Sequence, residues 1–372
     1  VSIFSLLPLP NSSAQSGASD NRVSLPDGPG NVGGFADNAE INLNMGSMSY
    51  SVPIGLPIGV GSETPSLSLS YSSMSGSSLL GMGWNLTVPS IERATAKGLP
   101  NYLTDDRFVV NESIKIVAIG EVQGINAVEY KAETEGSFVR YRWHNNDDGR
   151  NGYWTAELSN GVIEYYGANE DGELLAEARM GIESLGTFRY HLVARVDPFG
   201  NKSVYEYQDS VEGSAGSTKL LKSIKYVFND SGDHLYEVSL EYDPNRADPL
   251  SDCRPGYCEI MGQRLKEVKV LRGGETTGKY VIDYEDLSGQ ADLSRISKIS
   301  LFGRNDQEFQ GKYLFEYSKA LGMGCDDDRC GIPYLVDMGT VDGNLRSGAS
   351  TLIDLNGDAL PDILNTGGQS HT

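Results

Sequence analysis

Residues 138–166, FVRYRWHNNDDGRNGYWTAELSNGVIEYY, decide the fold of this chain. Three runs in this stretch, 138–143, 153–158 and 162–166, carry the aromatic and β-branched residues that favour strands. Asn151-Gly152 and Asn160-Gly161 separate the runs and are typical of tight hairpin turns. The stretch therefore predicts an antiparallel meander.

The second half of the chain repeats a strand that ends in an acidic residue followed by tyrosine. The copies are VYEY at 204–207, VSLEY at 238–242, VIDY at 281–284 and LFEY at 314–317. Their irregular spacing is repeat-like, and we expect a stack of antiparallel hairpins.

The composition agrees with an all-β fold. With 372 residues the chain is long enough for a large core, and 44 glycines and 20 tyrosines favour short strands joined by tight turns. Only residues 172–180, GELLAEARM, favour a helix.

The net charge argues against nucleic acid as a partner, and the length of the apolar runs argues against a membrane span. The formal net charge is −21 and no Lys/Arg cluster interrupts it, so nucleic acid is an unfavourable partner. No run reaches the ~18–20 apolar residues of a membrane span. The acidity fits a secreted, calcium-exposed protein, and equally a large β-protein that charge keeps in solution.

The first residues offer two interpretations. Val1 to Pro10, followed by Ser12-Ser13-Ala14, has the form of the end of a signal peptide or of a flexible terminal segment. We therefore assign residues 1–22 to a flexible or signal-peptide-derived segment.

A nine-residue loop near the end of the chain predicts a calcium site. In DLNGDALPD the side chains of Asp354, Asn356, Asp358 and Asp362, with the carbonyl of Leu360, supply oxygen ligands around one hard cation. The alternative is an Asp/Asn-rich turn that binds no metal.

The surroundings of this loop predict its architecture. Residues 350–353 and 363–364 read as short strands, and the loop resembles the blade-turn loops of FG-GAP and VCBS β-propellers. An EF-hand would need Glu at the twelfth position, where Asn365 stands, and Ala359 replaces the usual turn glycine. We place a domain boundary near residue 345.

Four cysteines form two close pairs, Cys253-x4-Cys258 and Cys325-x4-Cys330. Two local disulfides are the first interpretation. A four-cysteine zinc site, whose usual spacing this pattern does not match, and reduced thiols remain alternatives.

Two glycine-rich motifs do not predict nucleotide binding. Residues 28–33 fit G-x-G-x-x-G, but no strand precedes them and no helix follows. Residues 273–279 fit most of a P-loop, yet Tyr280 replaces the Ser/Thr that would hold Mg²⁺, and the run continues as a strand. We expect a hairpin turn there.

No catalytic constellation is evident. Glu133-Thr134-Glu135 has an E-x-E form that is close to random in an acidic chain. Trp84, flanked by glycines, suits core packing better than a carbohydrate site. The four histidines, which have neither metal-ligand spacing nor a nucleophile partner, are His144, His191, His234 and His371.

A family resemblance covers residues 23 to 364. It is carried by LSLSYSS (67–73), LGMGWNL (80–86), PSIER (89–93) and GLPNY (98–102), and continues through Trp154, Asn160-Gly161, Tyr166-Gly167, DPFGN (197–201), YEY (205–207) and the segment from Cys325 to Pro333. In these residues the chain resembles the SpvB-type N-terminal domain of toxin-complex B components.

The resemblance implies a β-rich, non-catalytic part of a hollow shell. In toxin complexes such a domain precedes a β-propeller that docks on a channel-forming component, and YD/Rhs repeats that enclose a cytotoxic cargo. DPFGN is similar to a YD-repeat turn, with Val196 where the repeat has Tyr. In another branch the domain precedes an ADP-ribosyltransferase, and no residue here matches that catalytic domain.

These observations give three functional hypotheses. The first is a structural module of a secreted shell, in which residues 23–345 form stacked hairpins and 346–372 begin a calcium-binding propeller repeat. Its partners would be other segments of the shell and the channel component. The second is a secreted adhesion protein, and the third is the N-terminal part of an ADP-ribosylating toxin.

Overall fold

The computed structural model describes residues 39–42, 46–61, 63–103, 106–145, 152–214, 216–285, 293–304, 308–317, 350–353 and 362–365. The chain divides into two compact units, Val1–Phe315 and Glu316–Thr372. Nearly all regular structure in the described ranges is antiparallel β-sheet, which confirms the all-β prediction.

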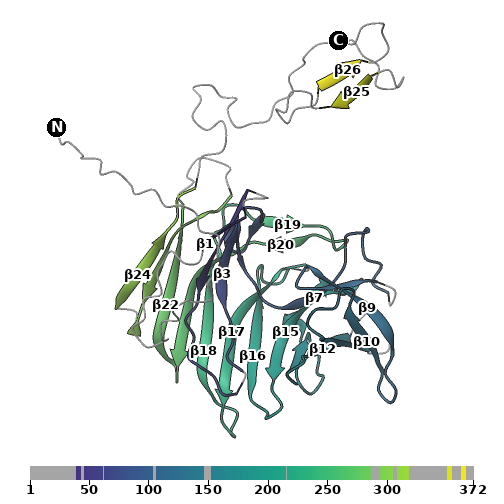
Figure 1. Cartoon of the computed structure of the whole chain (residues 1–372). Helices are drawn as coiled ribbons and strands as arrows, with labels where there is room; N and C mark the ends of the chain where they lie inside the picture. Colours follow the sequence, from purple (N-terminus) through teal and green to yellow (C-terminus); the bar gives the residue numbers. More distant parts are fainter. Residues whose placement is uncertain are drawn as a thin grey trace, which may run out of the picture. The chain divides into compact units, whose positions relative to one another are not determined.

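One sheet dominates the first unit (Figure 1). Its strands are β7 (Ser90–Arg93), β8 (Phe108–Val110), β9 (Ile114–Glu121), β10 (Ala127–Ala132), β11 (Arg140–Asn145), β12 (Gly152–Glu157), β13 (Ile163–Tyr166), β14 (Arg179–Ile182), β15 (Gly186–Val196), β16 (Lys202–Asp209), β17 (Lys219–Phe228), β18 (His234–Asp243), β21 (Arg264–Arg272), β22 (Glu275–Tyr284), β23 (Ile296–Phe302) and β24 (Phe309–Leu314).

The predicted meander is confirmed as β11, β12 and β13, and it belongs to a closed ring. The strands from β7 to β13 pair in chain order, β13 also pairs with β15, and β15 pairs with β7. The ladder therefore returns on itself. Figure 1 shows this part of the sheet curling round on the side of β7, β9 and β10, while β16, β17 and β18 stand side by side.

Aromatic side chains form the core where these strands curl. Trp154 on β12 is fully buried, and its ring centroid lies 4.8 Å from Phe108, 4.9 Å from Tyr130 and 5.2 Å from Trp143. Tilted and edge-to-face contacts of this kind add about 0.5–1.5 kcal/mol per pair to the burial of the rings.

The acidic-Tyr repeats lie at irregularities in the ladder. The pairing register shifts between Glu206 and Tyr207 on β16, and between Glu241 and Tyr242 on β18. The same shift occurs at Asp283-Tyr284 on β22. These are β-bulges, which bend a strand and increase its twist. The fourth copy differs, because β24 ends at Leu314, before its Glu-Tyr step.

A second, smaller sheet packs on the first. Its strands are β1 (Ala39–Asn42), β2 (Ser47–Pro53), β3 (Ser68–Ser72) and β6 (Trp84–Leu86). Trp84 lies 4.7 Å from Phe315 between ring centroids, and the segment after β2 is bonded to the main sheet by Gly55 N–H to the Tyr280 hydroxyl at 2.8 Å. The contact between Trp84 and Phe315 belongs to one hydrophobic core that both sheets share.

Two predictions about local structure have different outcomes. Residues 273–274 form a two-residue hairpin between β21 and β22, with φ of +57° and +83°, as expected for a glycine pair in a type I′ turn. The prediction of a helix over 172–180 is wrong. This stretch contains only the 3₁₀-helix η1 (Ala176–Ala178) before β14 begins, because Met180 and Ala178 are buried against the sheet.

Three short hairpins complete the described ranges. They are β4 (Ser77–Ser78) with β5 (Gly81–Met82), β19 (Leu250–Asp252) with β20 (Glu259–Met261), and β25 (Ser350–Ile353) with β26 (Asp362–Asn365). The last confirms the short strands expected on both sides of the acidic loop.

Candidate functional site

The residues predicted to bind calcium are only partly placed. Ile353 lies opposite Asp362 in the β25–β26 ladder, so the two ends of the loop are neighbours. Asp354, Asn356, Asp358 and Leu360 lie outside the described residues. The site therefore remains a prediction.

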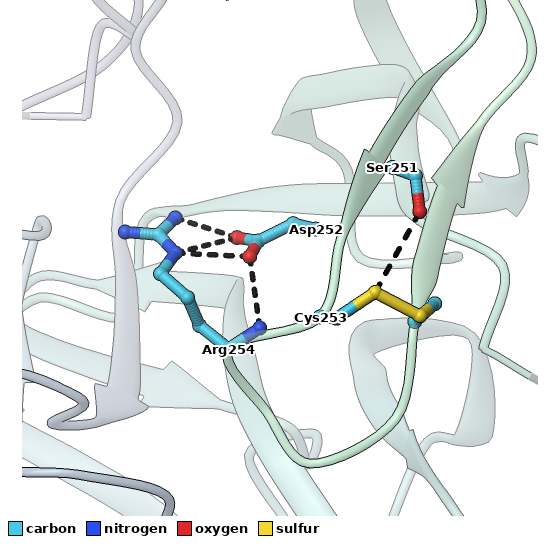
Figure 2. Close-up of a disulfide and its surroundings, with 5 residues drawn as sticks. Ser251, Asp252, Cys253 and Arg254 are labelled. Atoms are coloured by element: carbon cyan, nitrogen blue, oxygen red, sulfur yellow. Dashed lines mark hydrogen bonds and ion pairs between the residues drawn. A yellow bond between two sulfur atoms is a disulfide. The ribbon is translucent and has the colours of Figure 1, made fainter.

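The first cysteine pair lies at the tip of the hairpin β19–β20. Cys253 and Cys258 form a disulfide, and the Arg254 guanidinium binds the Asp252 carboxylate beside it at 2.5 Å (Figure 2). This is the local pairing that the x4 spacing predicts. The second pair, Cys325 and Cys330, lies outside the described residues.

The disulfide hairpin is fixed to the main sheet by hydrogen bonds. Thr218 N–H donates to the Ile260 carbonyl at 3.2 Å, and Ile260 N–H donates to the Gly216 carbonyl at 3.1 Å. The Tyr102 hydroxyl donates to the Pro255 carbonyl inside the disulfide loop at 2.7 Å. These bonds hold the hairpin as a fixed wall of the cavity described next.

A cavity of about 780 Å³ lies between this hairpin, the main sheet and the segment around β4 and β6. This volume lies within the range of small-molecule sites. Its lining combines hydroxyl, apolar and charged side chains. The charged and histidine side chains are Glu112, Arg189, His191, Lys219, Asp252, Arg254 and Glu259.

The cations of this lining are all paired. Arg189 binds Glu92 at 2.5 Å and lies 3.7 Å from Glu112. Lys219 binds Asp209 at 2.6 Å, and Arg254 binds Asp252. Each positive charge is therefore neutralised by a nearby carboxylate.

Glu259 differs from the other carboxylates. Its residue is 4% exposed, and within the described ranges it forms no ion pair; the Tyr257 hydroxyl lies near its carboxylate, whose Oε1 accepts no hydrogen bond. Burial raises the pKa of Glu259 to about 7, although the nearby Arg189 guanidinium acts in the opposite direction.

His191 is the second buried polar group of the lining. Its ring centroid lies 5.0 Å from that of Tyr207, and neither ring nitrogen has a hydrogen-bond partner in the described part of the chain. Burial lowers the pKa of His191 to about 3, and the positive charges of Arg189 and Lys219 act in the same direction. The imidazole is therefore neutral at physiological pH.

The other residues singled out in the sequence have local roles. His144 stacks on Tyr153 and contacts the Thr155 hydroxyl at 2.9 Å, and His234 contacts Glu237 at 3.3 Å. His371 lies outside the described residues. Among the placed residues, no group of three His, Cys, Asp or Glu side chains has a metal-binding arrangement.

The two remaining candidates are also structural. Glu135 accepts the N–H of Phe138 at 2.8 Å, and Glu133 lies 3.9 Å from Lys115, so the E-x-E carboxylates stabilise a turn and flank a strand. Trp84 is 1% exposed, which agrees with the core role expected for it.

Sequence reasoning missed the cavity residues Arg189, His191 and Glu259. The available signal was weak. Arg189 and His191 alternate along a mostly buried strand, and Glu259 directly follows a cysteine that closes a short loop. A charged residue in such a position indicates a partner or a cavity.

Two kinds of relative share sequence or fold with this chain. Curated relatives described as mono(ADP-ribosyl)transferase SpvB, from Salmonella choleraesuis and Salmonella typhimurium, are 29% identical over 190 residues, which is 43% of this chain and 31% of theirs. The match thus spans about a third of the length of these relatives.

Solved structures show the same fold. The N-terminal domain of effector protein SpvB from Salmonella typhimurium strain LT2 matches 68% of this chain and 99% of its own, with a TM-score of 0.58 and 18% identity. TcdB2-TccC3 matches 93% of this chain and 19% of its own, with a TM-score of 0.69 and 19% identity.

The described ranges contain no helix with the length and hydropathy of a membrane span.

The family follows from the sequence match. The model of the family described as Salmonella virulence plasmid 65kDa B protein matches residues 42–248, which is more than half of the chain. The chain therefore belongs to the SpvB family.

Proposed function

We propose that this chain is a non-catalytic structural module of a secreted toxin-complex B-type, Rhs-like protein, and that it forms part of a shell around a toxic cargo. The fold shared with TcdB2-TccC3 over 93% of the chain is the observation that supports this role most strongly. A long antiparallel sheet buries one continuous core and extends by adding hairpins, which suits a wall.

The chemistry of the polar side chains is consistent with a scaffold. The tyrosines of the repeats donate to main-chain carbonyls, and their acidic neighbours pair with lysines on the next strand. Groups used in this way stabilise the sheet and are not free to act on a substrate.

The partners follow from the same proposal. Other segments of the toxin protein would continue the wall, and a propeller after this module would dock on a channel-forming component. The structure of the Photorhabdus luminescens Tc holotoxin pore matches 88% of this chain with a TM-score of 0.68, which supports a role in such an assembly.

Calcium binding belongs to this proposal. Asp354, Asn356, Asp358 and Asp362 supply an all-oxygen donor set, and the pairing of Ile353 with Asp362 brings the residue before the loop opposite its last proposed ligand. A bound ion would stiffen this turn. Calorimetric titration of the chain with Ca²⁺ should give a binding isotherm that Asp358→Ala weakens and that Asp252→Ala leaves unchanged.

Protease protection tests the shell. In the complete toxin protein that contains this chain, the cargo should resist proteinase K as long as the wall is intact. Val238→Asp places a charge at a buried position of β18 and should expose the cargo, whereas Leu235→Asp, on the same strand but 38% exposed, should not. Cargo that is digested at the same rate in all three proteins would contradict the proposal.

A second candidate has one specific observation in its favour. The curated relatives are described as mono(ADP-ribosyl)transferases, although the match spans only about a third of their length. In that case the chain would be the non-catalytic N-terminal part of an ADP-ribosylating toxin. Incubation with labelled NAD and a host-cell lysate should give no labelled protein with this chain, and labelling would show that catalysis resides in it.

A further inference from the structure

The cavity beside the disulfide hairpin contains one carboxylate, Glu259, that forms no ion pair within the described residues and that carries a charge above pH 7. Its three cations, Arg189, Lys219 and Arg254, are each paired with a carboxylate, whereas Glu259 forms no ion pair within the described part of the chain. An anion would thus meet no available cation. A positive group would meet a desolvated carboxylate, against which an ion pair is far stronger than in water.

Two buried polar groups point to an organic ligand at this place. His191 is 7% exposed and Glu259 is 4% exposed, both line the cavity, and polar atoms of both have no hydrogen-bond partner among the placed residues. A buried polar group without a partner costs about 1–3 kcal/mol. A ligand that donates to the Glu259 carboxylate removes this cost.

The rest of the lining fits an alkyl chain next to a charge. Both apolar side chains and small hydroxyl groups line the cavity. They are Leu79, Leu86, Val88, Leu220 and Leu221, with Ser77, Ser78, Thr87, Ser90 and Thr218. The alkyl stem of a ligand would pack against the apolar side chains, and its polar substituents would form hydrogen bonds with the hydroxyl groups. A bare metal ion would use neither.

We propose that this cavity binds an organic cation, an alkylammonium or alkylguanidinium group, whose charged end pairs with the Glu259 carboxylate. The site does not depend on the shell role. The cation is either a free small molecule or the side chain of a lysine or arginine on a polypeptide, and both present the same chemistry to the cavity.

The ionisation of Glu259 makes this binding pH-dependent. The groups that affect it are Arg189, Asp252, Glu92 and Arg254, and its charge in turn affects Tyr257 and Tyr102. With a pKa of about 7, the carboxylate is mainly protonated at pH 6 and mainly charged at pH 8. A permanently charged guanidinium should therefore bind about tenfold more tightly at pH 8 than at pH 6.

Calorimetric titration of the 372-residue chain with butylguanidinium tests the proposal. The matched neutral probe is N-butylurea, which keeps the shape and loses the charge. A second arm uses the blocked peptide Gly-Gly-Arg-Gly-Gly against the same peptide with citrulline. Binding of either charged probe over its neutral partner supports the site, and the stronger arm identifies the source of the cation.

Two variants locate the binding. Glu259→Gln keeps the size of the side chain and should weaken butylguanidinium binding at least about tenfold. Glu112→Gln removes a lining carboxylate that is already near Arg189 and should change affinity less than about twofold. Equal affinity for the charged and neutral probes, no binding in either arm, or full affinity in Glu259→Gln would each overturn the proposal. If Glu259→Gln does not fold, the pH 6 to pH 8 ratio of the parent chain decides.

Discussion

At the scale of single residues, the interior of this protein contains charges that are held by several partners. The Arg93 side chain is fully buried. Its Nε donates to the Thr187 carbonyl at 2.9 Å and its Nη1 to Asp106 at 2.7 Å, while its guanidinium lies about 5 Å from the ring centroids of Tyr102 and Phe108. These contacts offset the cost of removing two charges from water.

Replacement of Arg93 should therefore be among the most destabilising single changes. Arg93→Met leaves the Asp106 carboxylate buried without its cation, and we expect the free energy of unfolding to fall by about 3–5 kcal/mol in urea denaturation. The exposed pair Lys115–Glu133 is the matched control, because Lys115→Met should cost less than about 1 kcal/mol. Equal losses in the two variants would contradict this account.

The buried Glu259 links stability to pH. Its folded-state pKa of about 7 is above the ordinary value of 4.5, so the folded protein holds this proton more tightly than the unfolded chain does. Stability is then lost as the pH rises from about 4.5 to 7 and stays lower above that. The shift corresponds to about 3 kcal/mol at pH 8.

Glu259→Gln should remove this loss. In urea denaturation without ligand, we expect the variant to be about 3 kcal/mol more stable than the parent at pH 8 and of similar stability at pH 4.5. Glu112→Gln, with an exposed side chain, should stay within about 0.5 kcal/mol of the parent at either pH. A variant that is less stable than the parent at pH 8 would show that Glu259 has a favourable partner.

At the scale of strands, the acidic-Tyr repeat has a physical cause. At each irregularity the extra residue stands on the following strand, and the tyrosine hydroxyl donates to a main-chain carbonyl of the preceding strand. The bonds run from Tyr207 to Leu192, from Tyr242 to Leu221 and from Tyr284 to Leu265, each at 2.6 Å. The acidic residue before the tyrosine pairs with a lysine on the following strand, at 2.6 Å for Glu206–Lys225, 2.7 Å for Glu241–Lys269 and 3.0 Å for Asp283–Lys298. Each repeat thus binds both neighbouring strands.

Removal of one such hydroxyl tests the importance of the bulge bond. Tyr242→Phe should lower the free energy of unfolding by about 1–2 kcal/mol, because the Leu221 carbonyl loses its donor in a half-buried position. Tyr236→Phe, on the same strand, should change it by less than about 0.5 kcal/mol, since no hydrogen bond of the Tyr236 hydroxyl occurs in the described ranges. Equal effects of the two changes would assign no special role to the bulge.

The hairpin turns depend on Asx caps to different degrees. Asp197 Oδ1 accepts the N–H groups of Phe199 and Asn201 at 2.9 Å in the DPFGN turn, and the residue is 4% exposed. Asn229 caps the next hairpin turn through Ser231 and Asp233 but is exposed. Asp197→Ala should lower the free energy of unfolding by about 1–2 kcal/mol. Asn229→Ala should lower it by about half as much, because water can reach the exposed turn and bind the N–H groups that Asn229 leaves. Thermal unfolding of both variants measures the difference, and the opposite order would contradict the argument.

Local chemistry explains which elements could be predicted. The strands β11 to β13, the Gly273-Gly274 hairpin and the strands around the acidic loop follow from residue pattern and turn residues within short windows. The helix expected at 172–180 failed because burial of its apolar residues against the sheet outweighed its propensity. The cavity could not be predicted, because residues distant in sequence, such as Glu112, Lys219 and Glu259, meet there only through the sheet topology.

At the scale of the first unit, β15 organises the sheet. Arg189, Tyr190 and His191 of this strand pair with β7, whereas Ala194, Arg195 and Val196 pair with both β13 and β16. One strand thereby closes the ring of β7–β13 and starts the open series of hairpins that runs to β24. The β7–β15 pairing is distant in sequence and carries a higher loop-closure cost than the local β15–β16 hairpin, so we expect it to form later in folding.

The most direct test of the shell is a cryo-electron microscopy structure of the complete protein that contains this chain. The account predicts that β16–β18 and β21–β24 lie in the wall of a closed hollow, with further strands of the same protein beside them and density for a cargo segment inside. A map in which this module stands as a separate domain, with solvent on both faces of the sheet and no enclosed volume, would contradict it.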